Sequence, residues 1–244
     1  MLKYLDSPFL YQDTAEIIAI KDNSIILNQT IFYPKGVGQP SDKGIISLNG
    51  TQSIIKEAYV KDGEVRHNIE DISYFSIGDT VELNIDKKAR LEHSAIHTLG
   101  HLIDEAMLNL DYYNSITPLK AFHYPEGPSV EYKGDLSSYN LENLRIEVEN
   151  EVNKMLKAGF ETQSFFISAN DIDKYCHKIT INSNLLNNHN DKNIRVVIVW
   201  GEKGITCMGT HVKNINQIQG ISIPKISNKK GIVKFSYRLL GINE

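Results

Sequence analysis

The sequence predicts an α+β protein, with a small β-barrel-like domain over residues 1–86 and an α+β domain over residues 87–244. Two observations predict this class. The first part contains short runs rich in Ile and Val, which are separated by turn signals and show no helical period. At Lys87 the apolar residues change to helical spacing, and β-branched runs return later in the chain. Short strands at such intervals favour a small barrel or sandwich for the first part.

Five runs are expected to form the strands of the first domain. They are AEIIAI (15–20), SIILNQTIFY (24–33), GIISLNG (44–50), SIIKEAYV (53–60) and TVELNI (80–85). The glycine-rich segment FYPKGVGQPSDKG (32–44) lies between two of them. It lacks the GK[ST] ending and the following helix of a phosphate-binding P-loop, so its residues alone indicate a structural turn.

The second domain is expected to begin with a helix over residues 88–110, in which apolar residues recur near one side. Residues 122–137 indicate a hairpin or two irregular strands. Residues 141–159, LENLRIEVENEVNKMLKAG, predict a long amphipathic helix that ends at a glycine. Further strands are expected at FETQSFFIS (160–168), at NIRVVIVW (193–200), which reads as buried on both faces, and twice within residues 219–240.

The composition is ordinary for a globular protein, with 41% hydrophobic and 23% charged residues. The net charge of −4 excludes a strong overall basic field, but it leaves a local basic face open. Two groups of cations are candidates for such a face: Lys87, Lys88 and Arg90, and Lys225, Lys229 and Lys230. For any single lysine of these groups, ordinary solvated charge is the alternative interpretation.

The N-terminal residues have no basic start followed by an apolar segment, and no run approaches 18 apolar residues. We therefore expect a cytoplasmic protein without a membrane partner. The two cysteines, Cys176 and Cys207, are too few for a disulfide framework, so each is expected to be a thiol or a metal ligand.

Two pairs of residues have the spacing of metal ligands. His93 and His97 lie one helical turn apart, so both imidazoles project from one face of the predicted helix. Ser94 occupies the position where the zinc-protease motif has Glu, so the base of that enzyme class is missing. His101 extends the row and is interpreted as a packing or supporting neighbour of the site.

The second pair, Cys207 and His211, lies in TCMGTHV, where Gly209 allows a sharp turn that lets both side chains converge. Either pair alone is also consistent with ordinary core or surface side chains. Together they offer four N/S donors, a set that suits tetrahedral Zn²⁺. Cys176 and His177 are a rival pair, but adjacent residues seldom face one metal, so they are interpreted as a buried thiol beside a surface imidazole.

The three stretches together resemble the alanyl-tRNA synthetase editing-domain family, in its free-standing AlaX form. The family segments FYPxGGGQPSDxG, RxxHTATHLL and CGGTHV are matched here by FYPKGVGQPSDKG, RLEHSAIHTL and CMGTHV. The order of the motifs also agrees, and the resemblance spans nearly the whole chain. Two departures are Val37, at the middle glycine of the first motif, and Met208, at the first glycine of the third, which bears on the choice of amino acid.

The resemblance implies a zinc-dependent hydrolase that deacylates mischarged tRNA(Ala), releasing serine, and in some members glycine, from the 3′ end. An alanine pocket excludes these amino acids poorly by size, which is why a second sieve is needed. Since no aminoacylation domain precedes the motifs, editing in trans is expected, with the acceptor stem and the aminoacylated 3′ end as the partner. Carried over by the resemblance, the metal residues are His93, His97, Cys207 and His211, which would form a zinc site between a helix and a strand end.

Catalytic residues other than the zinc site are not identified by these motifs. Thr210, Ser94 and Gln39 are candidates for binding the hydroxyl of serine, because an unpaired partner for that hydroxyl would disfavour alanine. Their alternatives are a turn hydroxyl, a solvent-facing hydroxyl and a loop brace. Two other functions stay open: a non-catalytic tRNA-binding module with a structural zinc, and a metallo-amidohydrolase, which the missing Glu disfavours. The oligomeric state is not determined by the sequence.

Overall fold

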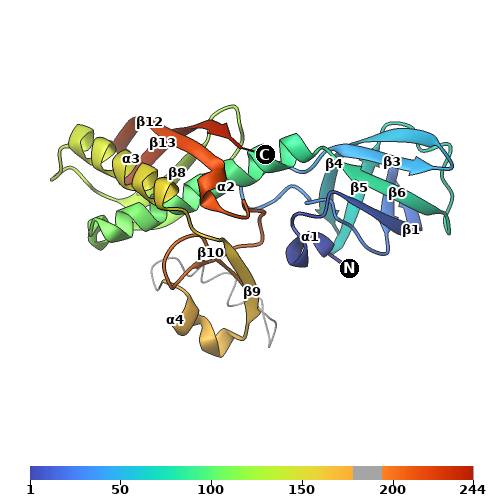
Figure 1. Ribbon diagram of the computed structural model, residues 1–244, viewed down its shortest axis with the longest axis horizontal. Helices are drawn as coiled ribbons and strands as arrows, with labels where there is room; N and C mark the ends of the chain where they lie inside the picture. The colour runs from blue at the N-terminus through green and yellow to red at the C-terminus, as the bar shows by residue number, and fades with distance from the viewer. Residues whose placement is uncertain (178–193, 244) are drawn as a thin grey trace. The chain divides into compact units, whose positions relative to one another are not determined.

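The computed structural model describes residues 1–177 and 194–243, and the chain divides into two compact units, residues 1–93 and 94–244. The division falls within helix α2 (Lys87–Asn109), which follows the last barrel strand. Figure 1 labels the helices and strands. The predicted combination of an N-terminal β-barrel with a mixed α/β remainder is confirmed. No helix in the described part of the chain is long and apolar enough to cross a membrane.

The first unit is a closed barrel of antiparallel strands in the order β1-β2-β5-β4-β3-β6. The elements are α1 (Lys3–Asp6), β1 (Gln12–Lys21), β2 (Ser24–Leu27), β3 (Gly44–Leu48), β4 (Thr51–Lys61), β5 (Glu64–Ile69) and β6 (Thr80–Ile85). Alternating residues fill the interior, as in β6, where every second side chain is buried. Strand β5, EVRHNI, was not predicted, because Arg66 and His67 are buried polar residues that interrupt an apolar alternation.

The strand predicted over residues 24–33 is shorter than expected and ends at Leu27. Beyond Leu27, two side chains form hydrogen bonds with backbone groups that would otherwise pair within the sheet. The guanidinium of Arg90 donates to the carbonyl oxygen of Ile31 (2.7 Å), and the carboxylate of Asp42 accepts from the amide of Tyr33 (2.5 Å). Arg90 and Asp42 form an ion pair, with Nε 2.7 Å from Oδ1, and both are almost fully buried.

The glycine-rich segment is therefore a turn fixed by a buried ion pair, and side-chain bonds replace the sheet hydrogen bonds that residues 31–33 would otherwise make. Within this turn the backbone N–H of Gln39 donates to the carbonyl oxygen of Gly36 (2.8 Å). Val37, at the middle glycine of the family motif, has φ of +40°, a backbone conformation that is strained for a β-branched residue.

His67 lies inside the barrel wall as a neutral imidazole. Its Nδ1–H donates to the carbonyl oxygen of Ile25 (3.1 Å), and its Nε2 is 2.8 Å from the hydroxyl of Thr30, which it can accept. Burial lowers the pKa of His67 to about 4. The imidazole therefore connects β5 to β2 and to the segment that follows β2.

The second unit combines two sheets with helices. The strands form a three-stranded sheet in the order β11-β10-β9 and a four-stranded antiparallel sheet in the order β12-β13-β8-β7. The strands are β7 (Ile116–Phe122), β8 (Ser129–Gly134), β9 (Gln163–Ile167), β10 (Ile194–Ile198), β11 (Ile205–Thr206), β12 (Ile218–Lys229) and β13 (Ile232–Ile242). Among the described residues, the helices of this unit other than α2 are α3 (Leu141–Ala158), α4 (Ile172–Tyr175) and 3₁₀ turns at Tyr112–Ser115, Ala169–Asp171 and Ile215–Gln217. Asn140 caps the start of α3 through its side chain, and Gly159 ends it with φ of +73°.

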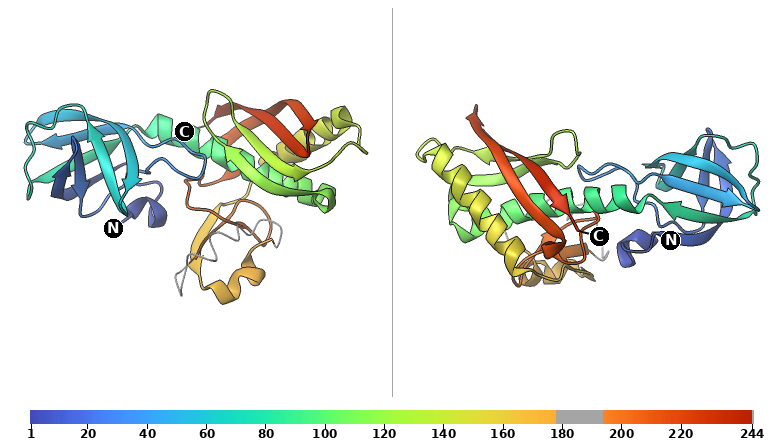
Figure 2. Two further views of the ribbon diagram at one scale, coloured as in Figure 1. Left: turned by 180° about the vertical axis from the view of Figure 1, so that it is seen from behind. Right: turned by 45° about the horizontal axis from the view of Figure 1, so that its top comes forward.

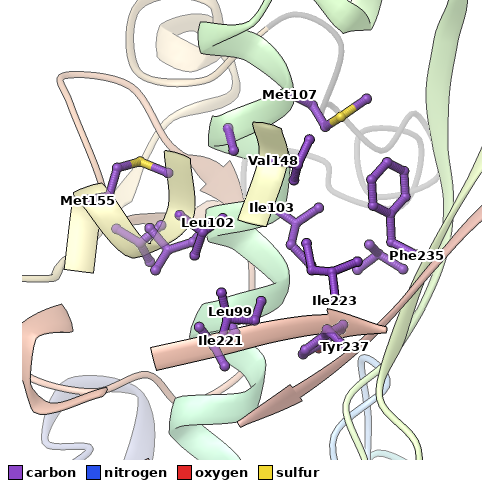
Figure 3. Packing of buried hydrophobic residues seen from close by; sticks show 14 of the residues in the cluster. Leu99, Leu102, Ile103, Met107, Val148, Met155, Ile221, Ile223, Phe235 and Tyr237 are labelled. Carbon is purple, nitrogen blue, oxygen red and sulfur yellow. The ribbon is translucent and has the colours of Figure 1, made fainter. Parts of the chain in front are cut away.

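The expected strands of the second unit are found, with shifted ends. Of the hairpin predicted within residues 122–137, only the second strand, β8, lies in that range; its partner β7 precedes the range and shares only Phe122 with it. Strand β10 is buried at every position, Arg195 included, as its nearly continuous β-branched run predicts. The core of this unit lies between α2, α3 and the inner face of the four-stranded sheet, and Figure 3 shows residues of α2 such as Leu99 and Ile103 beside Val148 of α3 and Phe235 of β13.

Helix α2 approaches the sheet closely at Gly100. A Cβ atom at this position would lie 2.4 Å from Cε1 of His123, which follows β7, and 3.2 Å from the hydroxyl of Tyr237 on β13. A glycine within a helix is less favourable than alanine by about 1 kcal/mol. The close approach of the His123 ring is therefore the physical reason for this residue.

We expect Gly100→Ala to destabilise the second unit by about 1–3 kcal/mol, because the added methyl group overpacks the contact with His123 by more than the gain in helix propensity. Urea unfolding of the two single variants and of Gly100→Ala/His123→Ala forms a double-mutant cycle. The double variant should lose much less stability than the sum of the single variants. A Gly100→Ala protein as stable as the parent would contradict this explanation.

The barrel should lose stability in mild acid through His67. Below its unfolded pKa of about 6.5 the unfolded chain binds a proton that the folded barrel rejects until about pH 4, so stability is complete above pH 6.5 and falls as the pH falls through this window. The contribution is about 1.4 kcal/mol per pH unit. Urea unfolding from pH 7.5 to pH 4.5 should give a flatter dependence for His67→Phe than for the parent. Equal slopes would show that His67 is not held neutral.

Candidate metal centre

Four donor side chains converge in the second unit. They are His97, His101, Cys207 and His211; all four are buried, and their candidate ligand atoms lie within 4.8 Å of one another. Sγ of Cys207 is 3.4 Å from Nε2 of His97. The ligands of a tetrahedral zinc ion lie roughly 3.5 Å apart. The cluster therefore has the size and donor types of a zinc site, with two ligands from α2 and two from the segment after β11.

Three of the four residues carried over from the family motif are in this cluster, and His93 is not. His101, interpreted from the sequence as a supporting neighbour, completes the set. HSAIHTLGH contains two overlapping pairs at the same spacing, so spacing alone cannot choose between them. His93 is buried in the other unit, and its Nδ1 has no hydrogen-bond partner among the described residues.

Thr98 fixes the orientation and the tautomer of His211. Its hydroxyl donates to the carbonyl oxygen of Ser94 (2.7 Å), so its oxygen is left to accept from the Nδ1–H of His211 (3.2 Å) and the amide of Val212 (3.3 Å). With the proton on Nδ1, Nε2 of His211 carries a lone pair. This buried Nε2 has no hydrogen-bond partner among the described residues. A metal-bound histidine usually has this arrangement, in which the second ring nitrogen is held by a polar partner.

His101 lies near Asp104, one turn further along α2, without a hydrogen bond to it. Its Nδ1 is 3.9 Å from the Asp104 carboxylate, and its Nε2 has no hydrogen-bond partner among the residues that the structure describes. Tyr113 and Tyr132 each donate to Oδ1 of Asp104 at 2.7 Å, which holds the carboxylate in place. Burial raises the pKa of Asp104 to about 6, and the two tyrosine bonds oppose this shift.

The segment of Cys207 is held by Arg195 of β10. Its guanidinium donates to the carbonyl oxygens of Cys207 (3.0 Å) and Gly209 (2.9 Å). These bonds turn the chain so that the amide of Gly209 donates to Sγ of Cys207 (3.3 Å). Burial raises the pKa of the Cys207 thiol, while this amide bond and the charge of Arg195 oppose the rise.

A fifth imidazole, His123, packs against the cluster and was not identified from the sequence. Its ring stacks on His97 with centroids 4.3 Å apart. The hydroxyl of Tyr237 donates to the carbonyl oxygen of Ile96 (3.0 Å), so it accepts from the Nδ1–H of His123 at 2.7 Å. His123 is thus fixed between α2 and β13, and it braces the His97 ring from one side.

The electrostatics of the cluster favour a cation. Burial lowers the pKa of His97 and His211 well below the ordinary value and that of His101 to about 4, so these imidazoles stay neutral and keep their lone pairs. Buried lone pairs without a donor are unfavourable, and a thiol beside them ionises readily only when a cation is present. The donor set therefore fits a divalent ion that prefers nitrogen and sulfur ligands in tetrahedral geometry.

The three candidate hydroxyl-binding residues have different surroundings. Ser94 and Thr210 lie together, with their hydroxyl oxygens 2.8 Å apart, and both are buried, so the solvent-facing alternative for Ser94 is wrong. Thr210 precedes His211, which places this hydroxyl pair beside the cluster. Gln39 is fully buried in the turn of the first unit.

Cys176 is buried outside the cluster, and burial raises its thiol pKa to about 11.

Comparison with known proteins agrees with the resemblance seen in the sequence. A family model described as tRNA synthetases class II (A) matches residues 9–89. Alanyl-tRNA editing protein AlaX-M of Pyrococcus horikoshii is 35% identical over 43% of this chain and 49% of its own length. Alanyl-tRNA editing protein AlaX-M of Methanosarcina barkeri is 26% identical over 85% of both chains. Alanyl-tRNA editing protein AlaX-L of P. horikoshii is 25% identical over 93% of this chain and 54% of its own length.

The chain spans about half the length of the two Pyrococcus relatives that it matches. The similarity to the Methanosarcina protein covers most of both chains and includes more than the N-terminal barrel. Together with the three sequence motifs, these matches show that the chain is similar to the AlaX-type alanyl-tRNA editing proteins.

Proposed function

We propose that this protein hydrolyses the ester bond of mischarged tRNA(Ala), releasing serine and, as a second substrate, glycine, at a zinc site formed by His97, His101, Cys207 and His211. The observation that carries the proposal is the buried cluster of four N/S donors, in which two imidazole nitrogens have no other partner in the described structure. The similarity to proteins named alanyl-tRNA editing proteins supports the choice of substrate.

In this proposal the protein residues bind the substrate and hold the metal ligands. Thr98 keeps the proton of His211 on Nδ1, and His123 braces the ring of His97. Zinc, when bound, supplies Lewis-acid chemistry, which lowers the pKa of a bound water and polarises a carbonyl group.

The hydroxyl pair of Ser94 and Thr210 is our candidate for choosing serine over alanine. A substrate hydroxyl can exchange hydrogen bonds with this pair, whereas alanine has no hydroxyl and can form no such bond. Gln39, the third candidate from the sequence, lies in the glycine-rich turn of the first unit. A site that depends on such bonds discriminates more strongly than one that depends on size.

Replacement of the two alternative histidines should distinguish the two registers of the motif. We expect His101→Ala to reduce bound zinc to a small fraction of one equivalent, because a quarter of the donor set is lost, while His93→Ala keeps about one equivalent. Metal content after dialysis against a weak chelator gives the measurement, with circular dichroism as the control for folding. Loss of zinc in His93→Ala with retention in His101→Ala would contradict the proposed ligand set.

The reaction itself is tested with tRNA(Ala) charged with serine, glycine or alanine. The parent should release serine and spare alanine, and removal of zinc should abolish release. Ser94→Ala/Thr210→Val should narrow the preference for serine over alanine by about 10-fold or more, since each missing hydrogen bond is worth about 1 kcal/mol. A protein that holds zinc and binds tRNA but leaves every ester intact would instead be a tRNA-binding module with a structural zinc, the alternative that four protein ligands also permit.

A further inference from the structure

The four-stranded sheet of the second unit has an unusual charge distribution for a chain with a net charge of −4. Its strands carry one carboxylate, Glu131, and six cations: Lys120, Lys133, Lys225, Lys229, Lys234 and Arg238. Lys225 and Lys229 belong to one of the two basic groups noted in the sequence. Lys120, Lys133 and Lys234 lie outside both groups. A local positive surface therefore exists on a protein that is acidic overall.

The register of the strands places these cations on one face. Residues paired directly across antiparallel strands lie on the same side, so Lys225, Ser236, Ser129 and Phe122 form one row across the sheet. Ser227, Lys234, Glu131 and Lys120 form the next row, and Lys229, Ile232, Lys133 and Thr117 the third. The alternating residues, such as Val233, Phe235, Val130 and Tyr132, face the core. We call the face made by the three rows and Arg238 the outer face.

The outer face is accessible and mostly unneutralised. Lys120, Lys133, Lys225, Lys229 and Arg238 are exposed, and none forms a salt bridge within the described residues. Lys234 alone is paired, with its Nζ 3.1 Å from Glu131. Figure 2 shows the β7–β8 and β12–β13 hairpins side by side as one surface. Successive rows on a strand lie about 7 Å apart, so the cations are spread over the whole face.

One end of the outer face is aromatic and lies next to the metal centre. Phe122 and Tyr124 are stacked, with centroids 4.5 Å apart and planes 17° apart, and Phe122 is 40% exposed. Phe122 also lines a cavity of about 280 Å³ with Lys120, Ser129, Glu131 and Lys234. The residue between the two aromatics is His123, which points to the opposite side and stacks on His97.

Since β7 is the edge strand of the sheet, a flexible chain that crosses Phe122 can pass round this edge toward the metal centre. Exposed aromatic rings beside lysines are the surface on which unpaired nucleotides stack, and dispersed cations without partners are the surface that binds a phosphate backbone. Lysine is depleted in protein–protein interfaces, so a lysine-rich face favours RNA over a protein partner.

We infer that the outer face binds the acceptor stem of tRNA through its phosphates, with an unpaired nucleotide of the 3′ end stacked on Phe122. This inference rests on the proposed function and adds to it the surface that holds the RNA. The stem lies along the rows of lysines, and the end of the RNA turns at β7 toward His97 and its neighbours. Recognition of the stem is by shape and charge, without contacts to base edges.

The test measures binding of uncharged tRNA(Ala) transcript by fluorescence anisotropy from 50 to 300 mM salt. Lys225→Gln/Lys229→Gln and Lys120→Gln/Lys133→Gln should each weaken binding about tenfold in 0.1 M salt and reduce the slope of log K against log salt by about 1 to 2. The matched control is Lys154→Gln/Lys157→Gln on α3, which changes two exposed lysines of the same unit away from this sheet and should bind like the parent. Face variants that bind as tightly as the parent would overturn the inference.

Phe122→Ala tests where the 3′ end lies. Loss of one stacked base should weaken binding of the full transcript about fivefold or more, and it should leave unchanged the binding of a transcript that lacks the unpaired 3′ nucleotides. An equal effect on both transcripts would overturn this placement. Because binding is measured without an ester, a parent that binds through the outer face but releases no amino acid would refute the proposed function and keep the inference. If the parent releases serine but the face variants bind tRNA as tightly as the parent, the proposed function is kept and the inference about the outer face is refuted.

Discussion

The burial of neutral imidazoles and a thiol in one apolar core is the constraint on which the second unit depends. A buried polar nitrogen without a hydrogen-bond partner is unfavourable by about 1–3 kcal/mol. Within the described part of the chain, the Nε2 atoms of His101 and His211 are both in this situation. Thr98 holds the proton of His211 on Nδ1, so Nε2 of His211 cannot itself become a donor to another group. A divalent cation satisfies these donors together and stabilises the thiolate of Cys207, so metal binding and folding of this region are expected to be coupled.

Helix α2 meets several requirements at once because its side chains are divided by the helical repeat. One face supplies His97 and His101 to the cluster, and another supplies Leu99, Leu102 and Ile103 to the core. Gly100 lies where the helix must approach the sheet, and the space left by its missing Cβ is filled by His123. The helix therefore cannot rotate without burying an imidazole in the core or exposing a leucine. The ligand geometry is fixed by the same packing that stabilises the unit.

The four-stranded sheet separates two environments by the alternation of its side chains. Its inner residues pack against α2 and α3, while its outer residues are cations and small polar groups. His123 and Phe122 are adjacent in the chain and belong to opposite sides, so the structural support of the metal centre and the inferred RNA surface meet at one edge strand. The net charge of −4 does not indicate this surface, because the acidic residues that make the net charge negative lie almost entirely outside these strands.

The sequence by itself determined the class of fold, the two long helices and the identity of three donors in the cluster. Local periodicity and the fixed spacing of Cys207 and His211 carry that information. Only the tertiary structure shows that His101, and not His93, lies in the cluster, because the two overlapping pairs have identical spacing and differ only in how α2 packs against the Cys207 segment. It also decided the end of β2, where Arg90 and Asp42 replace sheet hydrogen bonds. His123, Asp104 and Tyr237 act through contacts with residues far away in the chain, and no local pattern records such contacts.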